Sequence, residues 1–124
     1  FLRPLGLRLV LKRLTEMGGI NDYQYAQQMA RSAVERKGYG LRRAAEMMRQ
    51  KGVPKNVIAA VLQPYEETVP ERLQQILERH YAEKLSDPSD RKMVERVKAA
   101  LVRKGYSFSE IQAAVQRYWE ETEP

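Results

Sequence analysis

Residues 21–62 read NDYQYAQQMARSAVERKGYGLRRAAEMMRQKGVPKNVIAAVL, and this stretch decides the fold. Its apolar residues recur every three or four positions, a spacing typical of helices with one buried face. Lys-Gly pairs at 37–38 and 51–52 interrupt the pattern, because glycine tolerates the left-handed conformation that follows a helix. The stretch therefore predicts three short helices. Their buried faces are Ala26, Met29, Ala30 and Ala33, then Leu41, Ala44, Ala45 and Met48, then Val57, Ile58, Val61 and Leu62.

The starts of these helices are also marked. Asn21 or Asp22 is expected to cap the first helix, because a short polar side chain accepts bonds from the free amides of the opening turn. Pro54 suits the first turn of the third helix, where the missing N–H has no intrahelical partner to lose. Upstream, the apolar residues of 7–14 predict one more amphipathic helix, which ends at Gly18-Gly19.

Downstream, Pro64 and Pro70 bracket the acidic stretch 65–69, which we interpret as a turn that joins two modules. Helical patterns then cover about 70–84 and 93–104, and the second ends at another Lys-Gly pair.

The last helix begins at a recognisable cap. Ser107-Phe108-Ser109-Glu110 matches a capping box, in which the serine and the glutamate satisfy each other's backbone amides. We assign Tyr25, in the first helix of the opening stretch, to the core. The predicted buried face of the last helix is Phe108, Ile111, Val115 and Trp119.

An internal repeat relates the two halves of the chain at an offset of 53 residues. Lys51-Gly52-Val53 falls on Lys104-Gly105-Tyr106, and Ile58 falls on Ile111. Helical repeats of this kind stack along one axis. We therefore predict an all-α protein of tandem three-helix modules that form an elongated, curved rod.

The predicted division leaves the first module truncated. Residues 1–19 would be the last helix of that module, residues 20–66 the second module and residues 67–124 the third. We interpret the chain as the remainder of a longer protein, since Phe1-Leu2-Arg3-Pro4-Leu5 lacks a methionine and the apolar run of a signal peptide.

Composition narrows the functional classes. The chain has no cysteine, which rules out disulfides and thiolate metal sites and fits a reducing, cytoplasmic compartment. It also has no run of about 18 apolar residues, so we expect no membrane segment. The net charge is +6, and residues 1–63 hold 12 Lys and Arg against 4 Asp and Glu. This basic half favours a polyanionic partner, although a solvated cationic surface has the same pattern.

The sequence carries no pattern typical of catalysis. His80 lies beside a helical apolar stripe without metal-ligand spacing, and the glycines are isolated helix stops rather than a phosphate-cradling loop. Glu66-Glu67 and Glu120-Glu121 lie on a predicted turn and on the tail, which are poor settings for acid–base chemistry. We expect no enzyme activity, no cofactor and no metal.

One basic corner is the candidate partner-binding or nucleic-acid-binding face. Residues 36–43 read RKGYGLRR, with four cations around a predicted turn, and an aromatic residue beside arginines can stack on a base. The alternative is a solvated face. Glu46 is expected to pair with Arg42. The candidate residues are Arg36, Lys37, Tyr39, Arg42, Arg43 and Arg49.

Four ordered motifs run through nearly the whole chain. They are Leu7-x-x-Val10-Leu11-x-x-Leu14-x-x-x-Gly18-x-Ile20-Asn21-Asp22-x-x-Tyr25-Ala26, Lys37-Gly38-Tyr39-Gly40-x-x-Arg43, Lys51-Gly52-Val53-x-x-x-x-Ile58 and Lys104-Gly105-Tyr106-Ser107-x-x-x-Ile111. Together they resemble the bacterial RecX family of regulatory proteins. The chain departs from that pattern at Gly19-Ile20-Asn21, where the family usually has Tyr-Leu-Asp, and at Leu41, where a proline is common.

The resemblance implies a non-enzymatic regulator of the RecA recombinase. RecX family members bind the RecA–DNA filament along its groove and inhibit its recombinase, ATPase and coprotease activities in DNA repair, recombination and the SOS response. We expect a monomer that binds DNA alone only weakly and without sequence preference. The alternative is a helix-turn-helix-like module that acts directly on DNA, because three-helix units resemble such domains. A scaffold without regulatory action is a third hypothesis.

Overall fold

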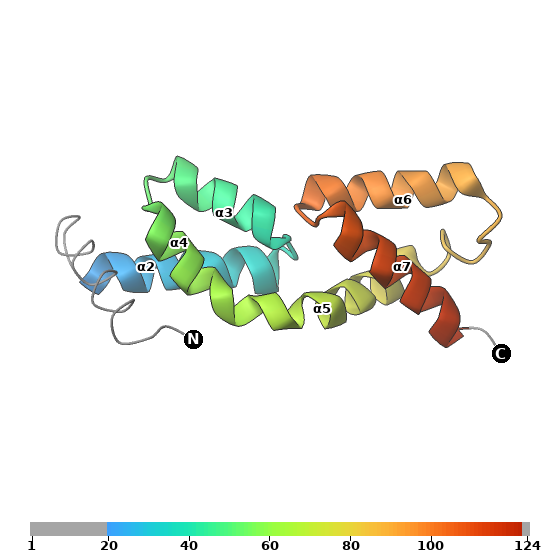
Figure 1. The fold of residues 1–124 in the computed structure, drawn as a ribbon, viewed down its shortest axis with the longest axis horizontal. Coiled ribbons are helices and arrows are strands. Elements are labelled where there is room, and N and C mark those ends of the chain that lie inside the picture. Colours follow the sequence, from blue (N-terminus) through green and yellow to red (C-terminus); the bar gives the residue numbers. More distant parts are fainter. Residues whose placement is uncertain (1–19, 123–124) are drawn as a thin grey trace.

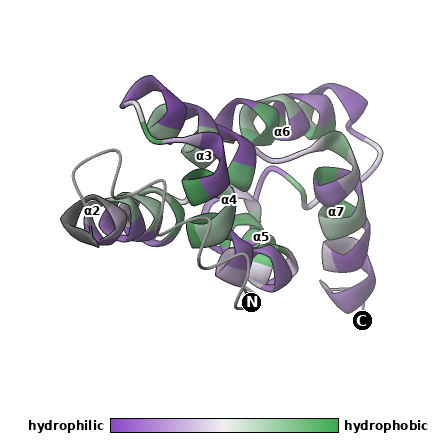
Figure 2. Cartoon of the chain, turned by 60° about the vertical axis from the view of Figure 1, so that its left-hand side comes forward, coloured by the Kyte–Doolittle hydropathy of each residue, from purple (hydrophilic) through white to green (hydrophobic). Residues whose placement is uncertain are grey.

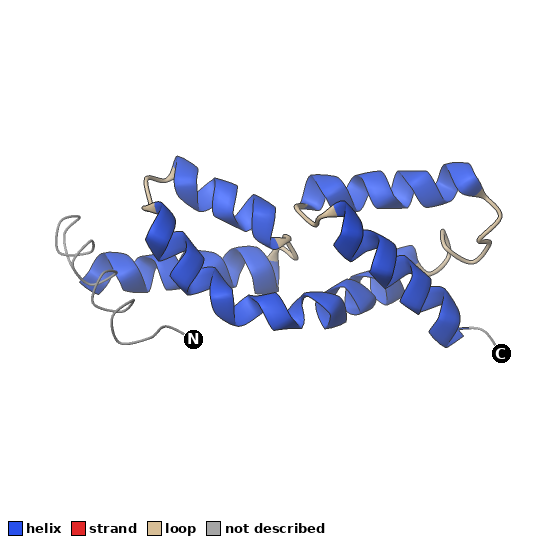
Figure 3. Cartoon of the chain, in the orientation of Figure 1, coloured by secondary structure: helices blue, strands red, loops and turns tan. Residues whose placement is uncertain are grey.

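The computed structural model describes residues 20–122, and this part of the chain is helical without a strand (Figure 3). The predicted helix at 7–14 lies outside the described residues. The prediction of an all-helical chain is confirmed for the described part. The elements are α2 (Ile20–Arg31), η1 (Ser32–Arg36), α3 (Leu41–Gln50), α4 (Lys55–Leu62), η2 (Gln63–Thr68), α5 (Val69–Ile76), η3 (Leu77–Tyr81), α6 (Arg91–Lys104) and α7 (Phe108–Thr122).

The helices form two groups along one axis, which makes the molecule elongated (Figure 1). The front module consists of α2 to α4 and the rear module of α5 to α7. In the front module α4 packs on α2 and α3, and in the rear module α7 packs on α5 and α6. The prediction of tandem three-helix modules is confirmed, while the precise boundary at residues 66 and 67 stays a prediction.

Alanines make up five of the twelve buried residues in the core of the front module. Ala26, Ala30, Ala33 and Ala44 are fully buried there, around the larger Met48. The apolar side of these helices faces inward and the hydrophilic side faces out (Figure 2). Because alanine lets helix backbones approach closely, α2 and α3 can pack tightly against α4, which supplies larger side chains such as Ile58 and Leu62.

Large side chains fill the core of the rear module. Leu73, Leu77, Leu101 and Ile111 are fully buried. Trp119 closes one end of this core, since its indole N–H donates to the carbonyl of Leu85 at 2.9 Å. The rear module therefore buries more apolar surface per core residue than the front module, and apolar burial contributes stability in proportion to area.

The expected turn at 65–69 is wrong. Residues 63–68 form the 3₁₀ helix η2, so helical backbone continues from α4 through α5 into η3. Pro64 and Pro70 occupy the first turns of η2 and α5. A proline fits there because the first amides of a helix have no intrahelical partner. Two prolines in this segment therefore mark successive helix starts, and the connection is a helical strut.

Three further expectations need correction. Asn21 and Asp22 lie within α2, whose described part starts at Ile20, rather than at its cap. Tyr25 is 57% exposed, because it stands about 100° around the helix from the buried Ala26. Phe108 is 63% exposed. The buried face of α7 includes the predicted Ile111 and Val115, but its other members are Ala114 and Tyr118 rather than Phe108 and Trp119.

Candidate partner-binding site at the joint between the modules

Five of the six predicted binding residues lie at one corner of the front module, and the sixth, Arg49, lies away from them. Arg36 and Lys37 are exposed at the end of η1, and Arg42 is exposed on the first turn of α3. Tyr39 is half-buried in the connection between η1 and α3, where it packs against the front core. Arg49 lies at the far end of α3.

Arg43 is directed toward the rear module. Its guanidinium stacks over the ring of Tyr39, 4.0 Å from the centroid, and donates through Nη1 to the carbonyl of Arg103 at 3.2 Å. Lys37 lies near the same ring at 5.7 Å. Cation–π stacking of this kind holds a guanidinium in place. Tyr39 and Arg43 therefore already contact each other, and Arg43 also contacts the rear module.

Arg49, not Arg42, is the partner of Glu46. Arg49 donates to the two carboxylate oxygens at 3.0 and 2.6 Å. These bonds lower the pKa of Glu46 and raise that of Arg49. The spacing explains the correction, because residues three apart on a helix are as close as residues four apart. Arg42 carries no ion pair within residues 20–122.

A joint forms where the end of α6 meets the start of α3 (Figure 1). The amide of Gly40 donates to the carbonyl of Lys104 at 2.8 Å, and the amide of Arg42 donates to that of Gly105 at 3.3 Å. Free amides at a helix start carry partial positive charge and free carbonyls at a helix end carry partial negative charge. The two helices thus satisfy each other's unpaired ends.

Two glycines permit this contact. A Cβ added at Gly40 would lie 2.3 Å from the carbonyl oxygen of Gly105. A Cβ added at Gly105 would lie 2.4 Å from the Cβ of Arg43. Gly105 also has φ of 107°, which side chains other than glycine rarely adopt. Any larger residue at either position would separate the modules.

Tyr106 fastens the joint from the rear module. It is 1% exposed, and its hydroxyl donates to the carbonyl of Gly38 at 2.9 Å. Burial raises the pKa of Tyr106 to about 12, while the charge of Arg72 opposes this rise. The phenol therefore stays protonated near neutral pH and remains a hydrogen-bond donor.

The joint also brings together basic residues that sequence reasoning did not assign to a site. A pocket of about 160 Å³ beside the joint is lined by Arg36 and Lys37 from the front module and by Arg72, Arg79, His80 and Lys104 from the rear module. The four residues from the rear module lie in the half of the chain that has no excess of positive charge. No local pattern marks them, because the helices that carry them meet only in three dimensions.

Comparison with protein families gives two matches. Residues 21–62 match the family description "RecX, second three-helix domain", and residues 66–115 match "RecX, third three-helix domain". The chain belongs to the RecX family. Proteins named "Regulatory protein RecX" share 37% identity over 106 residues in Mycolicibacterium vanbaalenii and 33% over 105 residues in Halorhodospira halophila.

These RecX relatives are longer than the chain. The match with the M. vanbaalenii protein covers 79% of this chain and 56% of that protein, and the match with the H. halophila protein covers 85% and 63%. The chain thus spans little more than half the length of the first relative. No solved structure is significantly similar to it.

Two of the four motifs that carry the RecX resemblance meet at the joint. Gly38, Gly40 and Arg43 of the first glycine motif contact Gly105 and Tyr106 of the closing motif, or lie beside them. The motif therefore has a structural explanation in this RecX chain. Packing at the joint explains the positions of the glycines, of Tyr106 and of Arg43. The exposed cations that remain at the corner are Arg36, Lys37 and Arg42.

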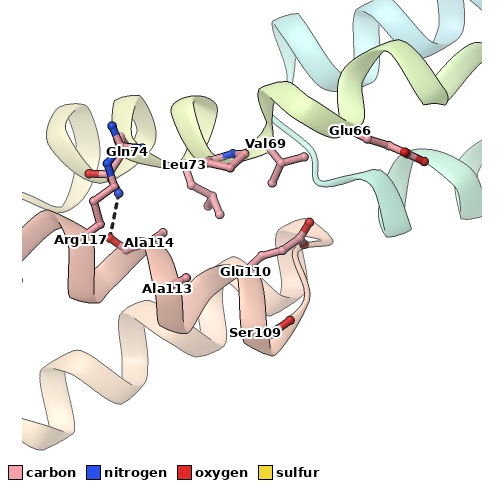
Figure 4. Close-up of a pocket in the computed structure, with 10 residues that line it drawn as sticks. Glu66, Val69, Leu73, Gln74, Ser109, Glu110, Ala113, Ala114 and Arg117 are labelled. Atoms are coloured by element: carbon pink, nitrogen blue, oxygen red, sulfur yellow. Dashed lines mark hydrogen bonds between the residues drawn. The ribbon is translucent and has the colours of Figure 1, made fainter. Parts of the chain in front are cut away.

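A second hollow lies between α5 and α7 (Figure 4). Its volume is about 360 Å³, and its walls include Leu73 and Ala113. Of its titratable residues, Glu110 accepts from the amide of Ser107 in the capping box, and Arg117 pairs with Glu71 at 2.9 Å. Within residues 20–122 no group of His, Asp and Glu could hold a metal ion. No helix in that range is long and apolar enough to cross a membrane.

Proposed function

We propose that this chain is a RecX-type regulator that binds the RecA recombinase on DNA and inhibits the recombinase, ATPase and coprotease activities of the filament. The observation that carries the proposal is the pair of successive RecX domain matches, which together cover residues 21–62 and 66–115. The relatives are named regulatory proteins. The proposed role is a regulatory one, exerted from the cytoplasm in DNA repair and the SOS response.

The shape and charge of the molecule support this role. An elongated pair of three-helix modules presents an extended lateral surface, which suits contact along a helical filament. Arg42 and Arg49 are seven residues apart on α3 and both are exposed, so they share a flank. A basic flank steers association with an acidic protein surface or with DNA phosphates.

The experiment measures RecA ATPase on single-stranded DNA against increasing concentrations of this protein. The double variant Arg42→Glu with Arg49→Glu reverses the flank and leaves Arg43 in the joint. We expect the concentration for half-maximal inhibition to rise about tenfold, because rim charges govern encounter with an oppositely charged partner. An unmodified protein that leaves ATPase unchanged would refute the proposal.

A matched control comes from the rear module. Arg96 and Arg103 are also exposed and seven residues apart, on α6. Reversal of both to glutamate changes the net charge by the same amount and places a negative charge at an equivalent helix end. We expect this control to inhibit like the parent. Equal loss in both double variants would mean that net charge, rather than the α3 flank, is responsible.

The alternative function is direct action on DNA. Measuring DNA binding in the absence of RecA distinguishes it from regulation of the filament. Non-specific binding to phosphates is weak and falls steeply with salt. Tight binding to one duplex sequence at 0.15 M salt would favour a helix-turn-helix-like DNA-binding module instead.

A further inference from the structure

The pocket beside the joint holds a concentration of positive charge. Its lining includes five cations, namely Arg36, Lys37, Arg72, Arg79 and Lys104, and one carboxylate, Glu35. Three separate elements supply them: the end of η1, the helix formed by α5 and η3, and the end of α6. The charge therefore converges on one small volume from several sides.

The carboxylate of the pocket is already engaged elsewhere. Glu35 accepts from the hydroxyl of Tyr65 at 3.3 Å and lies 3.6 Å from the guanidinium of Arg31. Among the described residues, none of the five lining cations lies within 4.0 Å of a carboxylate oxygen. Like charges gathered in a cleft repel one another, and an anion in the cleft would relieve that repulsion.

Parts of the pocket are held in position before any ligand arrives. The Nε of Arg72 donates to the hydroxyl of Thr68 at 3.0 Å, and its guanidinium lies 5.4 Å from the ring centroid of Tyr65. These contacts leave the terminal N–H groups of Arg72 available. The Nζ of Lys104 lies against Gly38, only 3.3 Å from where a Cβ would be. Such preorganisation reduces the entropy lost on binding.

We propose that this pocket binds a phosphate group. Its volume of about 160 Å³ is below the roughly 300 Å³ at which pockets begin to accept drug-sized ligands, so it suits a small anion. Arginine forks and lysine point charges are the usual partners of phosphate oxygens. A tetrahedral phosphate accepts bonds from several directions, as the converging cations require, whereas a carboxylate is planar and has two oxygens.

The phosphate site spans both modules, so a bound phosphate stabilises the joint. Arg36 and Lys37 belong to the front module, and Arg79 and Lys104 belong to the rear module. A ligand that requires both modules in place stabilises that arrangement by mass action. This inference does not rest on the proposed function, because the site binds its ligand without RecA.

The test uses the full 124-residue chain and two probes without RecA. The first is inorganic phosphate, compared with chloride at equal ionic strength, with the melting temperature as the readout. The second is a fluorescent single-stranded 12-mer, with anisotropy measured from 0.05 to 0.2 M salt. We expect a rise in melting temperature with phosphate, binding of the 12-mer, or both. Stabilisation by phosphate alone indicates a free phosphate ligand, and binding of the 12-mer alone indicates the nucleic-acid backbone.

The decisive variant is Arg79→Gln with Lys104→Gln, since both side chains line the pocket and neither forms an ion pair in the described part of the chain. Loss of about 1 kcal/mol of binding weakens affinity about fivefold. The salt slope should fall by about 0.7 for each phosphate of the single strand that the variant no longer neutralises. The control, Arg91→Gln with Lys92→Gln, removes the same charge at the opposite end of α6.

Two results would overturn the proposal. One is the absence of any effect of either probe on the parent chain at 0.1 M salt. The other is equal binding by the pocket variant and the control variant, which would mean that binding depends on the net charge of the chain and not on the pocket. Circular dichroism melts of both variants verify folding, and Arg79→Gln alone serves if the double variant melts early.

Discussion

The two Lys-Gly stops of the repeat have the same local structure and different surroundings. At the first, the amide of Gly52 donates to the carbonyl of Arg49 and that of Val53 to Met48; at the second, Gly105 donates to Val102 and Tyr106 to Leu101. Each acceptor is shifted by the same 53 residues. Both glycines have positive φ, at 87° and 107°. The repeat in sequence is therefore a repeat in hydrogen bonding.

Beyond the stop, the two sites differ completely. A Cβ added at Gly52 would meet nothing within 4 Å, whereas Gly105 is packed against the backbone of Arg43. The following residue is Val53 in the front module and Tyr106, which reaches Gly38, in the rear module. One copy of the motif ends a helix, while the other ends a helix and also joins two modules.

The largest expected effect comes from comparing Gly105→Ala with Gly52→Ala. In both variants alanine must adopt the left-handed conformation, which lowers the free energy of unfolding by about 1 to 2 kcal/mol. Gly105→Ala adds a clash with Arg43 worth about 1 to 3 kcal/mol, and should destabilise the chain by about 2 to 5 kcal/mol. Urea unfolding measures both values. An equal loss of stability in the two variants would mean that the contact between Gly105 and Arg43 can open without destabilising the chain.

Alkaline pH should lower the stability of the chain through ionisation of Tyr106. The equivalent residue of the front module, Val53, does not ionise. The folded pKa is about 12 and the unfolded value about 10, so the unfolded chain loses this proton first. Stability is therefore unaffected below pH 10 and falls by about 1 to 2 kcal/mol as pH rises to 12. Urea unfolding from pH 9 to 11.5 measures the fall. Tyr106→Phe should flatten it, and an unchanged profile would contradict the assignment.

The helix that follows each stop begins differently. Ser107 and Glu110 form a reciprocal capping box, with bonds of 2.7 and 3.2 Å. The equivalent position in the front module is Pro54, which provides no side-chain cap. Ser107→Ala should destabilise the chain by about 1 kcal/mol in urea unfolding. Ser109→Ala, inside the same helix, is the control and should change stability by less than about 0.5 kcal/mol. A similar loss of stability in both variants would mean that the capping box does not stabilise the chain.

The smallest expected effect is at Glu46, whose pair with Arg49 is confined to the surface of the front module. Exposed ion pairs contribute little to stability, because water screens both charges and the side chains lose conformational freedom. Glu46→Gln should leave the melting temperature unchanged within error. It should also strengthen filament inhibition slightly by freeing Arg49, and weaker inhibition would count against the α3 flank as the binding surface.

Much of the helix register could be predicted from the repeat itself. The offset of 53 places Phe108 on Lys55, which is exposed, and Tyr118 on Tyr65. A prediction based on this offset would have left Phe108 outside the core. The apolar stripe was misleading because Phe108 and Trp119 lie on one flank of the buried face, and hydrophobicity alone does not locate the centre of that face.

The candidate site was only partly predictable. Arg36, Lys37 and Arg42 are exposed cations of the predicted corner, but Arg43 is used by the joint. A guanidinium next to an aromatic residue in sequence can serve a partner or the protein's own packing. The choice depends on whether a second element approaches, and here the end of α6 does so from 60 residues away.

By itself, the sequence determined most of the helices, their glycine stops, the capping box and the repeat. These features depend on bonds and steric limits within a few residues, which local composition controls. Only the tertiary structure decided the joint and its basic pocket. Tyr106 meets Gly38 across 68 residues, and the lining cations come from both halves of the chain. Such contacts depend on how two folded modules dock, and packing between distant surfaces has no period that a sequence displays.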